Sequence, residues 1–335
     1  MRIGLIGAGA VAELHARAAE SLPHVRLTAV CDLVEDAARR VAAPRGAATF
    51  TDYRRLIGSG LVDAVIVNTP HALHREMVVD AAELGLHILV EKPMATSLAD
   101  CDTMRAACEA AEVTLVVGHI QHFLPEKVAA EAVLAQGECG SPVMVHDYRS
   151  TDYRPGTRSA WFFSTEIAGG GALMNIGAHC LDRSVWLGGA GAGAVRMTAA
   201  TSRRFGVPVE TDGTIHLELA NDVAASISIV SDPPRKVDEL MVVCERGVVT
   251  ADPRRGTFIR RDGRTRIVLE PSSSGIPDAF RAQLADFVAA VEGAPPRVSL
   301  DHGQHVVELV LAAYESAALG KPVVVGALPS PASRT

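Results

Sequence analysis

The sequence lacks the long apolar segments that membranes and export require. No uninterrupted run of about 18 apolar residues occurs, and no basic stretch followed by an apolar one stands at the amino terminus. An excess of positive charge is absent too, because 32 basic residues face 39 acidic ones, with no basic run or aromatic stripe. We therefore expect a soluble cytoplasmic protein whose partners include neither a membrane nor a nucleic acid.

Cysteine is sparse, with six scattered residues and no C-x-x-C spacing. This pattern argues against a disulfide framework and against a cysteine-rich zinc site. Two histidine pairs, His71-x-x-His74 and His119-x-x-His122, have a spacing that metal sites use. Each pair follows an apolar strand where the edge of a cofactor would pass. Since no cysteine or carboxylate cluster completes a coordination sphere, we expect no metal.

The chain of 335 residues is too long for one ordinary core, and its 48% hydrophobic content supports two well-formed interiors. We expect a first domain over 1–120, a second over 121–326 and a disordered tail over 327–335. In the first, apolar strands alternate with helical patterns, which predicts parallel βαβ units and an α/β fold. The expected strands lie near 2–6, 25–31, 64–68, 87–90 and 113–117.

The second domain has a different pattern, in which short turns join successive strands. This favours an α+β domain with a large, mainly antiparallel open sheet. The expected strands lie near 142–149, 194–202, 212–219, 223–230, 238–244 and 247–251, with a polar loop over 150–159. The expected helices span 125–136, 172–187, 280–291 and 306–319.

A dinucleotide fingerprint follows the first strand, in the segment Gly7-Ala8-Gly9-Ala10-Val11-Ala12. Gly7 permits the tight turn, Gly9 lets the backbone approach a pyrophosphate, and Ala12 lets the helix close on the strand. Ala10 and Val11 begin the helix, whose amino terminus suits phosphates. The second strand ends at Asp32, where an acidic side chain can hold a ribose 2′-hydroxyl and repel a 2′-phosphate. NAD is therefore expected, with NADP less favoured.

The most informative segment is Glu91-Lys92-Pro93, because a short apolar strand runs into it and ends on a lysine. A lysine at the carboxyl end of a parallel strand points to the crevice where open α/β sheets bind ligands. Partial burial there would lower its pKa, so Lys92 is a candidate catalyst. An ordinary surface lysine is the alternative. This triplet and the neighbouring strand ends contribute further expected cofactor contacts, which are Asn68, Thr69, Pro70, His71, His74, Glu91, Lys92, Pro93 and Gln121.

A second constellation lies on the mostly apolar helix predicted over 172–187. Asn175, His179 and Asp182 fall on one face at i, i+4 and i+7. Three such groups suit a polar cavity, where a histidine can accept a proton, an amide can hold a hydroxyl and a carboxylate can orient the imidazole. A solvent-facing stripe, or a histidine satisfied inside the core, explains the same spacing.

Together these motifs resemble the glucose-fructose oxidoreductase and inositol dehydrogenase family, Gfo/Idh/MocA, over nearly the whole chain. The resemblance rests on the opening fingerprint, the Glu91-Lys92-Pro93 triplet and the segment 169–182. It implies a Rossmann domain that binds NAD or NADP, and a second domain whose open sheet forms homodimers or homotetramers. It also implies that Lys92 and His179 flank the reacting carbinol carbon.

Two positions depart from the pattern of that family. Asn175 stands where many members have aspartate, so Lys92 and His179 must carry the proton chemistry. His122 stands where relatives often have arginine, which weakens the expectation of cofactor contacts from that segment. With asparagine at position 175, the chain resembles a subgroup of the family that includes nucleotide-sugar 3-dehydrogenases.

With these motifs, the resemblance implies reversible, NAD-linked oxidation of a secondary hydroxyl on a sugar, sugar derivative or cyclitol. His179 is the expected general base and Lys92 the group that stabilises the alkoxide, although the roles are exchangeable. Tyr153, Arg158 and Trp161 are expected to cover the sugar. A ketosugar reductase, an enzyme that cleaves glycosides by transient oxidation, and a non-catalytic dinucleotide-sensing regulator remain alternatives.

Overall fold

The computed structural model describes residues 1–189 and 193–326, so the predicted tail over 327–335 lies outside the described residues. The chain divides into two units. Unit 1 comprises Met1–Phe123 and Ile276–Gly303, and unit 2 comprises Leu124–Gly275 and the chain from Gln304 onward. Among the described helices, none has the length and hydropathy that a membrane crossing requires.

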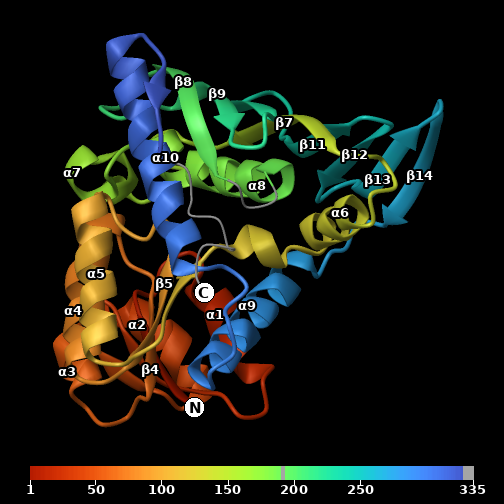
Figure 1. Ribbon diagram of the computed structural model, residues 1–335. Helices are drawn as coiled ribbons and strands as arrows, with labels where there is room; N and C mark the ends of the chain where they lie inside the picture. The colour runs from red at the N-terminus through yellow and green to blue at the C-terminus, as the bar shows by residue number, and fades with distance from the viewer. Residues whose placement is uncertain (190–192, 327–335) are drawn as a thin grey trace. The chain divides into compact units, whose positions relative to one another are not determined.

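Unit 1 is built on a six-stranded parallel sheet with the order β3-β2-β1-β4-β5-β6. The strands are β1 Arg2–Ile6, β2 Arg26–Cys31, β3 Ala48–Phe50, β4 Ala64–Val67, β5 His87–Glu91 and β6 Leu115–Gly118. Its helices are α1 Ala12–Glu20, α2 Glu35–Ala42, α3 Tyr53–Ile57, α4 His74–Glu83, α5 Leu98–Ala110 and α9 Gly275–Val291. In Figure 1, α4 and α5 run side by side near β4 and β5.

Burial of the central strands explains their sequences. Strand β4 is buried at every residue, as expected for a parallel sheet covered on both faces, and such strands read as continuous apolar runs. The five strands predicted from such runs are all present. Strand β3 was not predicted, because it has only three residues and lies at the edge of the sheet.

Helix α9 corrects the predicted domain boundary. Residues 276–303 were assigned to the second domain, but they belong to unit 1. The reason is packing, since Phe280, Leu284 and Phe287 are buried in one apolar cluster with Ile3 and Leu5 of β1. Unit 1 is therefore completed by a segment from late in the chain.

Unit 2 contains a nine-stranded sheet with the order β14-β13-β12-β11-β7-β10-β9-β8-β15. Only β7 and β10 pair in parallel, so the sheet is mainly antiparallel, as predicted. The strands are β7 Pro142–Thr151, β8 Ala194–Ser202, β9 Asp212–Leu219, β10 Ala224–Ser231, β11 Asp238–Cys244, β12 Gly247–Asp252, β13 Gly256–Arg261, β14 Arg264–Leu269 and β15 Val323–Val324. Strands β13, β14 and β15 were not predicted; arginines obscure the apolar pattern of the first two, and β15 has two residues.

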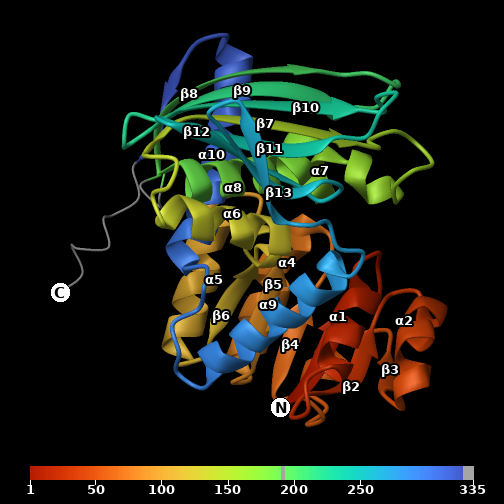
Figure 2. The same ribbon diagram turned by 90° about the vertical axis from the view of Figure 1, so that its right-hand side faces the viewer.

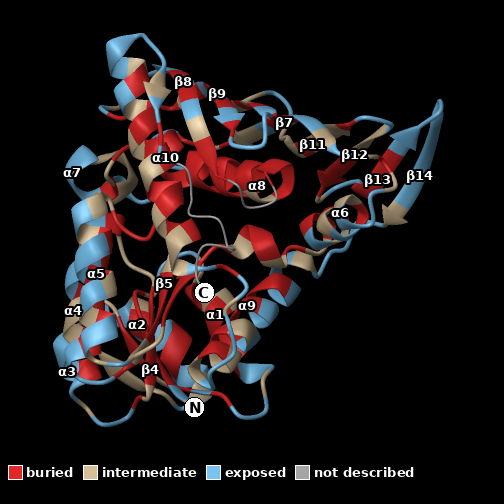
Figure 3. Cartoon of the chain, viewed as in Figure 1, coloured by how far each residue is buried: buried red, intermediate tan, exposed pale blue. Residues whose placement is uncertain are grey.

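The helices of unit 2 are α6 Pro125–Ala135, α7 Thr165–Ala168, α8 Ala178–Gly189 and α10 Leu300–Leu319, whose first turn belongs to unit 1. Helix α8 packs on one face of the sheet (Figure 2). It is buried along almost its whole length, as its red colour in Figure 3 shows. The predicted helix over 172–187 is in fact a π-helical turn, Leu173–Gly177, followed by α8.

A buried carboxylate anchors the start of this π-helical turn. Glu210 accepts hydrogen bonds from the backbone N–H groups of Gly171 and Leu173, both at 2.9 Å, and from the Tyr314 hydroxyl at 2.7 Å. Burial and the neighbouring Glu210 carboxylate raise the pKa of Tyr314 well above its ordinary value. Gly171 is required here, because a Cβ would lie 2.0 Å from the Glu210 carbonyl oxygen.

We predict that Glu210→Ala lowers the free energy of unfolding of unit 2 by about 3 kcal/mol, because three buried donors lose a charged acceptor. Urea denaturation followed by circular dichroism measures the change. Glu315→Ala, at an exposed position on α10, is the matched control and should cost less than about 0.5 kcal/mol. Equal losses in the two variants would contradict the anchoring role of Glu210.

Candidate active site

The fingerprint forms a tight turn between β1 and α1. Gly7 has a φ of 99°, and a Cβ there would lie 2.3 Å from the backbone oxygen of Asn68. A Cβ on Gly9 would meet no atom within 4 Å, so the backbone at Gly9 faces open space. Val11 caps α1 without a side-chain hydrogen bond. This arrangement suits a phosphate group, which would approach the glycine backbone and the positive end of the helix.

Asp32 holds the same turn together. Its Oδ2 accepts a hydrogen bond from the backbone N–H of Ala8 at 2.8 Å, and its Oδ1 accepts one from Val34 at 2.9 Å. The side chain is partly exposed, and each carboxylate oxygen has a second lone pair. The carboxylate can therefore accept hydrogen bonds from ribose hydroxyls while it supports the fingerprint. These observations are consistent with a dinucleotide in the turn.

The Glu91-Lys92-Pro93 triplet follows β5, and Glu91 pairs with Gly118 of β6. The peptide bond between Lys92 and Pro93 is cis. The Glu91 Oε1 lies 2.9 Å from Nε2 of His15, a buried residue on α1. Lys92 is partly buried and has a neighbouring carboxylate in Glu91. The triplet thus lies at the carboxyl edge of the parallel sheet, as predicted.

His74 corrects one predicted cofactor contact. Its side chain is fully buried, with Nδ1 3.1 Å from the Pro93 carbonyl oxygen and Nε2 3.0 Å from that of Thr69. Burial lowers the pKa of His74 despite these carbonyl groups. Its ring is inaccessible and joins the turn after β4 to the turn after β5, so a direct cofactor contact from His74 is not supported.

Two other predicted residues at this edge, His71 and Gln121, are also buried, whereas Asn68, Thr69 and Pro70 are partly exposed. His71 is 5% exposed and Gln121 is 2% exposed, after β4 and β6 respectively. His122 lies in a group of three imidazoles with His119 and His302, whose ring centroids are between 5.3 and 6.5 Å apart. Sequence reasoning missed His302, because it is far from the other two along the chain.

The second constellation is buried in unit 2. Asn175 lies in the π-helical turn, and His179 and Asp182 lie on α8. Asn175 is 7% exposed, His179 is 8% exposed and Asp182 is fully buried. The alternative of a solvent-facing stripe is therefore wrong. Single π turns within helices occur frequently at functional sites, which is consistent with a role for this segment.

A buried ion pair lies one residue beyond this constellation and was not predicted. Arg183 is fully buried and donates to both carboxylate oxygens of Asp147 on β7, at 2.7 and 2.5 Å, and to Asp238 on β11. Burial disfavours each charge, but the opposite charges prevail, so the pKa of Arg183 is raised and that of Asp238 is lowered. These partners come from distant strands, and no local spacing reveals them.

The loop after β7 is packed against itself. Tyr153 is fully buried, and its hydroxyl donates to the Phe162 carbonyl oxygen at 3.0 Å. Arg158 lies 4.8 Å from the Tyr153 ring centroid and donates to the carbonyl oxygen of Asp152 and to the hydroxyl of Thr151. Trp161 stacks on Phe162 with their centroids 3.7 Å apart. The prediction that Tyr153 covers a sugar is therefore wrong, because its ring has no exposed face; Arg158 and Trp161 are partly exposed.

Two family models match the chain. Residues 1–119 match a model described as an oxidoreductase family with an NAD-binding Rossmann fold. Residues 128–250 match a model of the GFO/IDH/MocA C-terminal domain. The matches agree with the six-stranded parallel sheet and the mainly antiparallel sheet of the structure.

Individual relatives support the same relationship. The rhizopine catabolism protein MocA of Rhizobium meliloti is 28% identical over 88% of each chain. An inositol 2-dehydrogenase of Saccharopolyspora erythraea is 28% identical over 99% of this chain and 98% of its own. Among solved structures, GenD2 from gentamicin A biosynthesis, in complex with NAD, has a TM-score of 0.87 and 27% identity, covering 97% of this chain and 96% of its own.

Proposed function

Because the chain belongs to the Gfo/Idh/MocA family of NAD-binding oxidoreductases, we propose that it oxidises a secondary hydroxyl of a sugar, sugar derivative or cyclitol. The observation that carries this proposal is the position of Lys92, which follows β5 at the same sheet edge as the fingerprint turn after β1. The substrate class draws support from the inositol 2-dehydrogenase and MocA relatives.

Bound NAD would supply the hydride chemistry, and the protein would position the substrate and manage one proton. We assign His179 as the general base and Lys92 as the hydrogen-bond donor to the reacting oxygen, with exchange of these roles as the alternative. Asn175 would hold a substrate hydroxyl and Asp182 would orient the imidazole. Arg158 and Trp161 would contact the sugar from the loop after β7.

A screen with purified protein tests the reaction class. Sugars, amino sugars, nucleotide sugars and cyclitols are each incubated with NAD or NADP, and nicotinamide reduction is followed by absorbance. We expect reduction with at least one polyol and a preference for NAD. NADH binding without reduction on any substrate, together with no oxidation of NADH by the matching ketones, would contradict the proposal and favour a dinucleotide-sensing regulator.

We predict that Lys92→Met lowers kcat by about 10²- to 10⁴-fold, because the reacting oxygen loses its positively charged partner. NADH affinity, measured by fluorescence titration, should change less than about threefold, since the lysine is not assigned to the pyrophosphate. Lys321→Met, at an exposed position, is the control and should leave both quantities unchanged. Normal turnover in Lys92→Met would remove Lys92 from the catalytic assignment.

We predict that Asp32→Ala weakens NAD and raises the ratio of NADP to NAD efficiency at least about tenfold. Without the carboxylate, the variant no longer accepts a hydrogen bond from the ribose hydroxyls of NAD and no longer repels the 2′-phosphate of NADP. Ratios of kcat/KM for the two cofactors measure the change. Asp36→Ala, on the exposed side of α2, is the control. An unchanged ratio in Asp32→Ala would mean that Asp32 does not contact the ribose.

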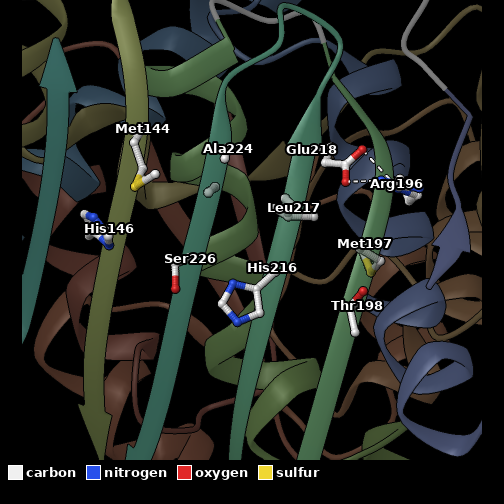
Figure 4. A pocket seen from close by; sticks show the side chains of 11 residues that line it. Met144, His146, Arg196, Met197, Thr198, His216, Leu217, Glu218, Ala224 and Ser226 are labelled. Atoms are coloured by element: carbon white, nitrogen blue, oxygen red, sulfur yellow. Dashed lines mark hydrogen bonds and ion pairs between the residues drawn. The ribbon is translucent and has the colours of Figure 1, made fainter. Parts of the chain in front are cut away.

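The exposed face of the nine-stranded sheet suits association between copies of the chain, as homodimers or homotetramers. Residues of β9 alternate between buried and exposed, and α8 packs on the buried face. On the exposed face, Ala224 and Ser226 form the floor of a hollow of about 390 Å³ between Met144 and His216 (Figure 4). The partly exposed apolar side chains of Met144 and Tyr148 add surface that a partner would bury.

We predict that Ser226→Glu reduces this self-association, because it places a carboxylate in the hollow and a partner would have to desolvate it. Sedimentation velocity over a range of concentrations measures the oligomeric state. Ser272→Glu adds the same charge at an exposed loop position and should not change assembly. A monomeric wild-type protein, or identical assembly of both variants, would contradict the proposed interface.

A further inference from the structure

A histidine on the fingerprint helix contacts the catalytic triplet. Helix α1 buries Ala12, Ala16, Ala18 and Ala19, yet it also buries His15, which is only 1% exposed. A buried imidazole is costly unless it has a polar partner. That partner is Glu91, whose Oε1 lies 2.9 Å from Nε2 of His15. The bond joins α1 directly to the residue before Lys92.

The charge of Glu91 depends on this contact. Burial of the carboxylate favours its neutral form, but the hydrogen bond and charge of His15, then Lys92 and His74, prevail and lower the pKa of Glu91. Glu91 is therefore ionised at neutral pH. Coupling between two charges is reciprocal, so the carboxylate that Lys92 stabilises in turn favours the ammonium form of Lys92.

The neighbours of Glu91 on α9 and β6 are uncharged. Gln283 of α9 and Gly118 of β6 border the carboxylate, since a Cβ on Gly118 would lie 3.3 Å from Glu91 Oε1 and 3.4 Å from Gln283 Nε2. Phe280 of α9 contacts His15 edge to face, with the ring centroids 4.8 Å apart. The positively charged or titratable groups that lower the pKa of Glu91 are His15 from α1, His74 from α4 and its own neighbour Lys92.

We propose that His15 is a positioning residue that keeps the Glu91 carboxylate ionised beside Lys92, so that Lys92 remains an ammonium during turnover. This inference rests on the proposed function, because it assumes that Lys92 donates a hydrogen bond to the reacting oxygen. It adds a role for a helix residue that does not itself touch the substrate.

The pH dependence of kcat tests this role. We expect the activity of the wild type to fall at alkaline pH, because an ammonium that donates a hydrogen bond to the reacting oxygen is lost when it is deprotonated. Without the anionic neighbour, Lys92 would lose its proton at lower pH, so the alkaline limb should move down by about one pH unit in His15→Leu and Glu91→Gln. His15→Gln keeps a hydrogen-bond donor and should restore at least half of that shift. His24→Leu, at an exposed position, is the control.

Circular dichroism and NADH titration establish that each variant is folded. Glu91→Gln is nearly isosteric and tests the effect of the carboxylate on Lys92. If His15→Leu does not fold, His15→Phe, which keeps a ring of similar size without a donor, tests the histidine in its place. An alkaline limb that stays in place in Glu91→Gln overturns the positioning role, even where stability falls. If Lys92→Met retains normal turnover, the proposed function itself fails. If Lys92→Met is inactive while Glu91→Gln keeps the wild-type profile, the proposed function stands and only the inference about His15 fails.

Discussion

The close approach of two turns, at Gly7 and Asn68, fixes the carboxyl edge of the parallel sheet. A side chain at Gly7 would collide with the Asn68 backbone, and the Asn68 amide donates to the Gly7 carbonyl oxygen at 3.3 Å. From there His74 continues the connection, because its ring lies between the carbonyl groups of Thr69 and Pro93. The ends of β1, β4 and β5 are thereby held as one rigid edge, which any ligand of the fingerprint turn would meet.

Unit 2 contains a helix with buried polar side chains, and opposite charges pair with the charged groups among them. Helix α8 and the preceding π-helical turn bury Asn175, His179, Asp182 and Arg183 almost completely. Arg183 forms ion pairs with Asp147 and Asp238 from two adjacent strands. Glu210 accepts hydrogen bonds from the backbone N–H groups at the start of the turn. These contacts fix where the π-helical turn begins and how α8 is rotated about its own axis. Any other rotation of α8 would leave buried charges without partners.

Sequence reasoning found the features whose signal is local and missed those that depend on distant partners. The fingerprint and the central strands of unit 1 were predictable, since a covered parallel strand must be apolar throughout. The Arg183–Asp147 pair was not, because its members lie on different elements with no shared periodicity. His74 was assigned to a cofactor from its position after a strand, and Tyr153 to a sugar from its position in a polar loop, yet both side chains are fully buried and lie within hydrogen-bond distance of carbonyl oxygens of the protein.

Unit 1 is formed by two separate segments of the chain, and the need to cover both faces of its sheet explains this as well as its apolar strands. A parallel sheet must be covered on both faces, and the segment up to Phe123 shares its apolar cluster with Phe280, Leu284 and Phe287 of α9. The returning helix also brings Phe280 against His15 and Gln283 near Glu91. The His15–Glu91 bond is largely buried, and hydrogen bonds in such surroundings are stronger than those of a surface pair. The late segment therefore packs around the His15–Glu91 bond as well as completing the core, so a cut at residue 120 would separate residues that are packed together.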